Sequence, residues 1–287
     1  MPSRIILALL CVSLCMQAAQ AIELKGELVQ GGIVIGKVQQ GQTVSYDGQK
    51  LPLSTGGQFV LGFDRDSPAS VALQITNLDG SSNEQQLSIE SRTYDIQRIE
   101  GISRKIMSPN EADLKRIRGE NISIGKARRV ISPREDFLQT FIWPLNGPIT
   151  GVFGSQRVYN GVPKRPHYGV DVAAPVGTRV RAPAGGSVRL AHDNMFYSGG
   201  TLVIDHGQGL NSSFLHLSKI LVQVGDEVKQ GQEIAEVGAT GRVTGPHLDW
   251  RMNWRKQRVD PQLLVDPQPQ AEPKPTVGKA STPTRQY

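Results

Sequence analysis

All five histidines of this 287-residue chain lie in its second half, and two of them precede an aspartate at an even spacing of two or four residues. His167 precedes Asp171 by four residues, and His247 precedes Asp249 by two. Along an extended strand, side chains two or four residues apart point to the same face. Each pair can therefore converge on one point. Two such pairs on separate strands can assemble a metal site from the histidine and carboxylate ligands that zinc accepts.

The segment that begins at His247 alternates strictly between polar and apolar residues. The polar positions are His247, Asp249, Arg251 and Asn253, and the apolar positions are Leu248, Trp250, Met252 and Trp254. This period of two predicts a strand with one face in the core and a polar face that can carry chemistry.

The rest of the chain predicts a mainly β protein that positions these strands. Glycine is abundant (31 residues) and aromatic residues make up only 6% of the chain, a composition that favours turn-rich β structure. We expect a small all-β sandwich over residues 22–98, a helical linker over 99–140 and an antiparallel β-sheet domain over 141–265. Proline and polar residues dominate 266–287, so we expect a disordered tail there.

One helix is predicted inside the linker. Ser108 and Glu111 have the spacing of a capping box, and Pro109 suits the first helical position, so a helix should run from about Pro109 to Arg118 or further. Its strong charge predicts a solvent-exposed connector. The basic cluster at residues 126–129 is interpreted as solvated linker.

Residues 1–21 have the features of a secretory signal peptide. Arg4 precedes an apolar run of twelve residues, which is too short to span a bilayer, and Ala19-Gln20-Ala21 is a small-x-small cleavage signal. We therefore expect cleavage near Ala21 and a periplasmic or secreted product. The formal net charge of +6 suits contact with an anionic polymer or surface and does not by itself indicate nucleic acid.

Further motifs follow one another in a fixed order between residues 143 and 261. They include Phe153-Gly154-Ser155-Gln156-Arg157, His167-x3-Asp171, Gly199-Gly200-x-Leu202-Val203-Ile204-Asp205-His206-Gly207, His216-Leu217-Ser218 and Gly241-Arg242-x-Thr244-Gly245-Pro246-His247-Leu248. This order resembles the lysostaphin/LytM-type peptidoglycan zinc endopeptidases. Residues 22–98 are similar to the N-terminal domain of that family's proteobacterial branch.

The resemblance implies roles for five residues. His167 and Asp171 match zinc ligands, and His216 and His247 match catalytic histidines that orient a water and move its proton. The family's third zinc ligand is a histidine, and Asp249 occupies its position here. A carboxylate oxygen reaches zinc at nearly the same distance as an imidazole nitrogen. Two carboxylates make the set more anionic, which favours harder ions such as Mn²⁺ and predicts a more alkaline pH optimum.

The function implied is that of an exported zinc endopeptidase that cuts peptide cross-links of peptidoglycan, with stem peptides as substrate. The alternative is a catalytically silent binding protein that recruits or activates another cell-wall hydrolase. Four of the five site positions are unchanged and the fifth is still a ligand type, which favours the enzyme. His206 and His192 receive no role: we expect a structural and a surface residue, respectively.

Overall fold

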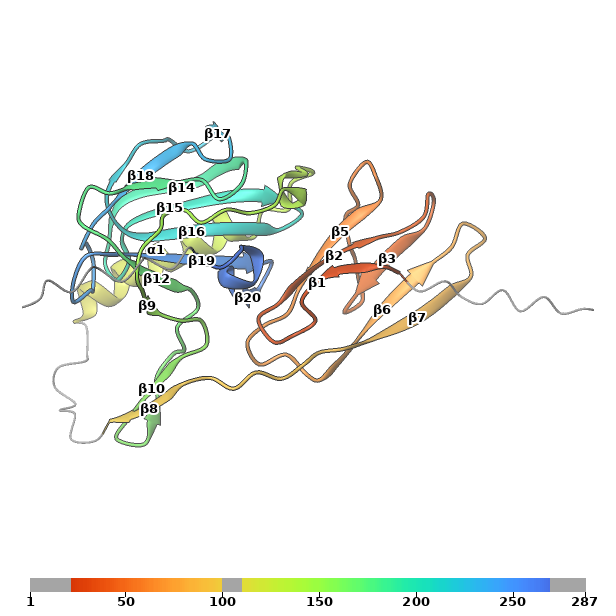
Figure 1. The fold of residues 1–287 in the computed structure, drawn as a ribbon, viewed down its shortest axis with the longest axis horizontal. Helices are drawn as coiled ribbons and strands as arrows, with labels where there is room; N and C mark the ends of the chain where they lie inside the picture. Colours follow the sequence, from red (N-terminus) through yellow and green to blue (C-terminus); the bar gives the residue numbers. More distant parts are fainter. Residues whose placement is uncertain (1–21, 100–109, 269–287) are drawn as a thin grey trace, which may run out of the picture.

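A computed structural model describes residues 22–99 and 110–268 (Figure 1). The expected signal peptide, residues 108 and 109 of the expected capping box, and the tail beyond residue 268 lie outside the described residues. The prediction of a mainly β protein is confirmed, because the described ranges contain twenty strands, one α-helix and two short 3₁₀ helices. Neither described range holds a helix long and apolar enough to cross a membrane.

Seven N-terminal strands form two small antiparallel sheets (red to orange in Figure 1). The first sheet has the order β1 (Leu24–Gly26), β2 (Ile33–Lys37), β5 (Gln58–Gly62). The second has the order β4 (Gln49–Lys50), β3 (Thr43–Tyr46), β6 (Ser70–Thr76), β7 (Ser82–Ser88). Burial alternates along β6, and the inward residues of both sheets join one apolar core, as a sandwich requires.

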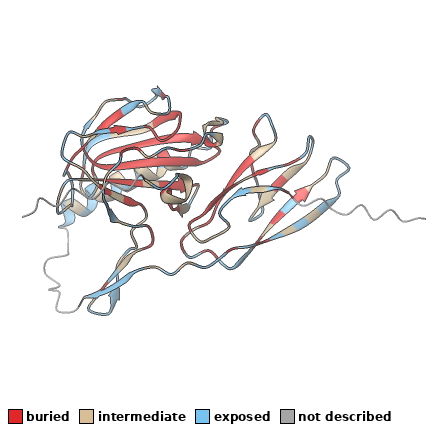
Figure 2. Ribbon diagram, viewed as in Figure 1, coloured by how far each residue is buried: buried red, intermediate tan, exposed pale blue. Residues whose placement is uncertain are grey.

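A ten-stranded sheet forms the second part of the molecule. Its main path runs β17 (Glu227–Val228), β14 (Gly186–Met195), β15 (Gly199–Gly207), β16 (Leu210–Ile220), β19 (His247–Trp254), β12 (Val170–Ala173), β9 (Ile149–Gly151). Three strands branch from it: β13 (Arg179–Arg181) pairs with β18 (Glu233–Val237), β18 also pairs with β16, and β20 (Gln257–Val259) pairs with β19. The inner strands are almost wholly buried (Figure 2).

A third small sheet links the two parts. Strand β8 (Ile96–Ile99), at the end of the N-terminal region, pairs in parallel with β10 (Gln156–Tyr159), which forms a hairpin with β11 (Val162–Pro163). The 3₁₀ helices cover Asp136–Leu138 and Pro261–Leu264.

Helix α1 (Glu111–Arg128) begins two residues later than predicted and extends well past Arg118. Its N-cap is Asn110, whose side chain accepts a hydrogen bond from the backbone N–H of Asp113 (2.9 Å). Asparagine satisfies an orphan N–H at a helix start as well as serine does, which explains the shift.

The helix is also more than a solvent-exposed connector. It packs against β14 and β15, and the Glu120 carboxylate accepts a hydrogen bond from the Phe196 N–H (2.9 Å). The basic cluster at 126–129 is likewise not wholly solvated. Arg128 is half-buried and donates two hydrogen bonds to the Ser213 hydroxyl of β16 (3.0 and 3.1 Å). The last turn of α1 therefore lies over the polar face of the large sheet.

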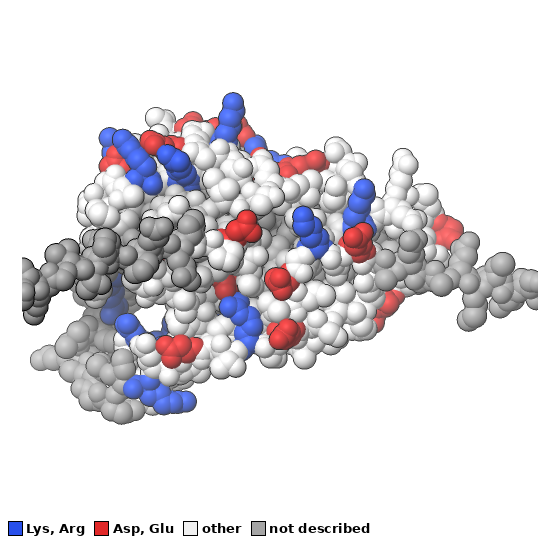
Figure 3. Space-filling view, in the orientation of Figure 1, with Lys and Arg blue, Asp and Glu red and all other residues white. Residues whose placement is uncertain are grey.

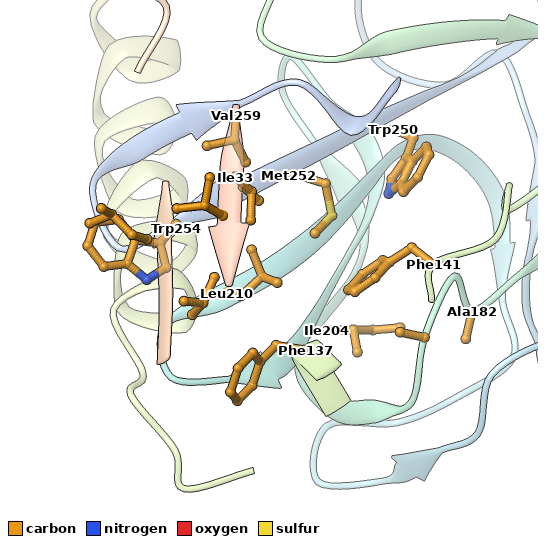
Figure 4. Close-up of a cluster of buried hydrophobic side chains, with 14 of the residues drawn as sticks. Ile33, Phe137, Phe141, Ala182, Ile204, Leu210, Trp250, Met252, Trp254 and Val259 are labelled. Carbon is orange, nitrogen blue, oxygen red and sulfur yellow. The ribbon is translucent and has the colours of Figure 1, made fainter. Parts of the chain in front are cut away.

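One continuous apolar core joins the N-terminal sheets to the large sheet. Figure 4 shows Ile33 of β2 in the same apolar cluster as Val259 and Leu210. Gly62 lies so close to β19 that a Cβ there would come within 2.7 Å of the Trp254 Cβ. Strand β19, which carries His247 and Asp249, thus packs its apolar face against the core. Its C-terminal end, at Trp254, packs against the N-terminal region.

Candidate active site

Strands β12 and β19 are antiparallel neighbours, and their pairing sets Asp171 directly opposite Asp249. Two like charges facing each other across strands are destabilising unless something compensates them, so this pairing points to a functional role. His167 lies in the loop before β12, where its backbone N–H donates to the Ser155 carbonyl (2.8 Å). The three side chains His167, Asp171 and Asp249 offer ligand atoms that all lie within 4.8 Å of one another.

The polar and apolar faces of β19 are as the sequence predicts. Trp250 and Met252 point into the core with Phe141 and Ile204 (Figure 4), whereas Asp249 lies on the opposite face with His247. The buried tryptophans anchor the strand, and the strand period then fixes the direction of the polar side chains.

His216 reaches this face through a local distortion of β16. Leu215 pairs with Asp249, so regular alternation would send the next residue to the opposite face. Instead, the pairing of β15 with β16 shifts register at this point, and His216 has a left-handed backbone with φ of 66°. Such bulges re-aim a side chain, and strain of about 1–3 kcal/mol in a non-glycine residue is typical of functional sites.

His216 and His247 lie together, with ring centroids 4.9 Å apart. The Nδ1 atom of each ring is 2.9 Å from a backbone carbonyl, that of Thr240 for His216 and that of Gly245 for His247. A carbonyl oxygen only accepts, so Nδ1 must carry the proton and Nε2 is left free in the neutral ring. The His216 Nε2 lies 4.0 Å from the Asp249 carboxylate, and the His247 Nε2 lies 3.9 Å from that of Asp171.

Burial lowers the pKa of His216, although the charge of Asp249 opposes this shift. The neutral form of His216 therefore dominates at neutral pH, and its free Nε2 can accept a proton. For His167, burial alone would lower the pKa, but the neighbouring carboxylates of Asp171 and Asp249 raise it.

Arg251 is the residue of the site to which the sequence analysis assigned no role. Its Nε lies 2.9 Å from Asp249 Oδ1 and its Nη2 lies 2.5 Å from Oδ2, a two-pronged ion pair. Burial would raise the pKa of Asp249, but the charge and hydrogen bonds of Arg251, with the nearby histidines, lower it to about 2. The signal was present in the sequence, since Arg251 stands two residues after Asp249 on the same face of the strand.

The donor set fits a divalent cation. The Nε2 of His167 and the Oδ1 of Asp171 are buried, have no hydrogen-bond partner and lie 3.2 Å apart. That separation suits two ligands of one small ion. Asp249 is 3% exposed and completes the set from the neighbouring strand.

Arg251 changes the charge expected of this set. Two carboxylates contribute two negative charges, and the guanidinium offsets one of them. The net charge of −1 equals that of a set with two histidines and one aspartate. The argument for a more alkaline pH optimum rested on a count without Arg251 and therefore no longer follows.

The remaining histidines lie where the sequence analysis expected them. His206 is fully buried, with its ring nitrogens 2.6 Å from the Gly185 carbonyl and 2.7 Å from the Ser212 hydroxyl. His192 is exposed.

Part of the chain matches a known protein family. Residues 165–261 match the model of peptidase family M23. The chain is 45% identical over 95 residues to the peptidoglycan DD-endopeptidase ShyB of Vibrio cholerae, and 40% identical over 128 residues to ShyA of the same organism. These alignments cover 33% and 44% of this chain but only 22% and 29% of the two relatives, so the chain matches less than a third of each.

A solved structure matches almost its whole length. A protein of Pseudomonas aeruginosa described as a peptidase M23 is 31% identical, with a TM-score of 0.66, over 83% of this chain and 95% of its own. The match covers most of the chain, well beyond the segment that carries the five predicted site residues. With His167, Asp171 and Asp249 brought together at β12 and β19 and this likeness in sequence and structure, the chain belongs to peptidase family M23.

Proposed function

We propose that this chain is an exported zinc metalloendopeptidase that hydrolyses peptide cross-links of peptidoglycan. The observation that carries the proposal is the convergence of His167, Asp171 and Asp249 within 4.8 Å, beside the paired rings of His216 and His247. The M23 family and the names of its curated relatives support a peptidoglycan substrate. The signal-like residues 1–21 support export.

In this proposal His167, Asp171 and Asp249 hold the ion. Zinc bound there supplies a Lewis acid that polarises the scissile carbonyl and makes water more acidic. Arg251 fixes the Asp249 carboxylate in one orientation and balances one of the two acidic charges.

His216 and His247 act as the general base and general acid in this proposal. The carbonyls of Thr240 and Gly245 hold both rings with Nε2 toward the site. The free Nε2 of a neutral ring accepts a proton from the attacking water, and a protonated ring returns it to the leaving amine. The ring that has gained the proton can also donate from Nε2 to the oxygen that gains charge during attack, which stabilises that oxygen.

Metal analysis combined with digestion of purified peptidoglycan tests the proposal. We expect about one divalent ion per chain and conversion of cross-linked muropeptide dimers to monomers. His167→Ala should lose the ion and the activity together. Stoichiometric metal retained in Asp249→Ala would remove Asp249 from the ligand set.

A second candidate function is a silent groove that binds peptidoglycan or activates another hydrolase. The contact that favours it is the Arg251 guanidinium on Asp249, because a bound cation and this guanidinium compete for the same carboxylate. A wild-type protein that is inert while Asp249→His cleaves peptidoglycan would establish this alternative. Activity of the wild type would exclude it.

A further inference from the structure

A pocket of about 630 Å³ opens beside His216, between helix α1 and the polar face of β16 and β19. Its walls carry seven arginines and one lysine, and no aspartate or glutamate lines it. Arg128 projects from the helix, Arg251 and Arg258 come from the sheet, and Arg165 comes from the loop before His167. Four separate segments thus deliver positive charge to one cavity.

Within the described residues this charge is offset only in part, by Asp249 next to Arg251 and by Asp64 near Arg258. Of the eight basic side chains, Arg251 alone forms an ion pair there, and its partner Asp249 belongs to the candidate metal site. Arg128 instead contacts the neutral hydroxyl of Ser213. On the face drawn in Figure 3, by contrast, basic and acidic side chains are interspersed.

Crowding of guanidinium groups in the pocket lowers the pKa of two of its arginines. Loss of water and the charges of Arg258, Arg251 and Arg165 hold the pKa of Arg128 well below its usual value. Loss of water, with the charges of Arg165 and Arg251, lowers the pKa of Arg258 to about 10. Repulsion between like charges destabilises a folded protein, so these arginines lower the stability of the fold while no anion lies between them. A bound anion removes the repulsion and gains charge-assisted hydrogen bonds.

We infer that this pocket binds the free carboxylates of an acidic peptide, and that it seats the stem peptide next to the bond to be cut. The inference rests on the proposed function and adds to it the part of the substrate that is recognised. His216 lines the pocket, so a peptide held with its scissile bond at His216 and His247 places neighbouring residues among the arginines. Stem peptides carry carboxylates on glutamate and diaminopimelate, and planar guanidinium groups pair with carboxylates in a two-pronged geometry.

The experiment measures binding without turnover. The full chain with His247→Ala is titrated calorimetrically, at fixed zinc, with a cross-linked stem-peptide dimer that bears free carboxylates. The same dimer with those carboxylates amidated is the ligand control, and inorganic pyrophosphate tests phosphate as the anion. Arg128→Gln and Arg258→Gln remove pocket charges, and Arg118→Gln is the matched control, because Arg118 is exposed on the same helix and does not line the pocket. Arg165→Gln is added because Arg165 is exposed, so its loss leaves the core intact.

We expect the amidated dimer, and each pocket variant, to bind about ten-fold or more weakly, the scale of a hydrogen bond between charged groups. Arg118→Gln should bind as its parent does, and binding should weaken as salt is raised. Equal binding of the free and amidated dimers, or unchanged binding in Arg165→Gln, would overturn the inference. The inference would also be overturned if the free dimer did not bind while pyrophosphate bound in a way that depended on Arg165, because the pocket would then select phosphate. Because binding is read without cleavage, a protein that binds the free dimer but never cuts it refutes the proposed activity and leaves the pocket standing.

Discussion

Replacing Arg251 by methionine removes the counter-ion of Asp249 and keeps an unbranched side chain of similar length. Breaking a buried ion pair by removing one partner costs about 3–5 kcal/mol, because a charge remains without compensation. The Asp249 side chain is 3% exposed and that of Arg251 is 25% exposed, so we take the lower end, about 3 kcal/mol. In a protein of this size that loss lowers the melting temperature by roughly 6–12 °C.

Zinc should reverse most of this loss. A bound cation supplies the positive charge that Arg251 no longer provides. The Asp249 carboxylate is then free to bind the cation alone, because no guanidinium competes for it. We therefore expect zinc to bind more tightly to Arg251→Met than to the wild type. The gain is limited by the same 3 kcal/mol, or about a hundred-fold.

The assay is calorimetric unfolding of both proteins, in chelator and in saturating zinc. A matched control exists in the same sheet. Arg189 pairs with Asp205 at 2.9 Å, and their side chains are 30% and 2% exposed, close to the values for Arg251 and Asp249. Arg189→Met should lose comparable stability, and zinc should not restore it, because Asp205 is not one of the three candidate ligands.

An equal loss for Arg251→Met with and without zinc would refute the reasoning. Unchanged zinc affinity would do the same, since it would mean that the guanidinium and the ion do not compete for Asp249.

Three further predictions concern the same region and its support. His216→Ala and His247→Ala should keep metal and fold but lose cross-link cleavage by about 10²-fold or more, measured by muropeptide analysis. Arg251→Met adds one negative charge to the site and should move the pH optimum up, whereas Asp249→His removes one and should move it down. The double variant restores the wild-type count, and its pH–rate profile should match that of the wild type. Burial lowers the pKa of His206 below 6.5, so folding disfavours its protonation, and stability should fall as the pH drops below about 6.5. His206→Gln should flatten this fall, measured by urea unfolding between about pH 7.5 and 5.5.

The controls for these predictions are specific. Wild-type digestion rates in both His→Ala variants would remove them from the chemistry. If the pH optimum of cleavage is the same in the wild type, Arg251→Met and Asp249→His, then the charge of the site does not set that optimum. His192→Gln alters an exposed histidine and should leave the pH dependence of unfolding as it is. If it flattens that dependence as much as His206→Gln does, burial is not the cause.

The parts of the site that follow from strand geometry were predictable. Side chains alternate along a strand with a period of two, so the polar face of β19 could be derived from spacing. His167 also meets Asp171, but it does so from the loop before β12 and not along one extended strand. The apolar face was equally clear, because Trp250 and Met252 have few alternatives to burial.

The parts that depend on tertiary contacts were not predictable. Regular alternation would have turned His216 away from the site, and only the family resemblance identified it, because a bulge with a left-handed residue leaves little trace in one sequence. Helix α1 has two good capping residues close together, Ser108 and Asn110, and sequence alone does not choose between them. The inward turn of Arg128 depends on where the helix docks.

Muropeptide digestion by protein of counted zinc content tests the central claim most directly. If His167, Asp171 and Asp249 hold a catalytic ion, conversion of cross-linked dimers to monomers should rise in proportion to bound zinc and level off at about one ion per chain. Dimers left intact by protein that carries one zinc per chain would contradict the claim.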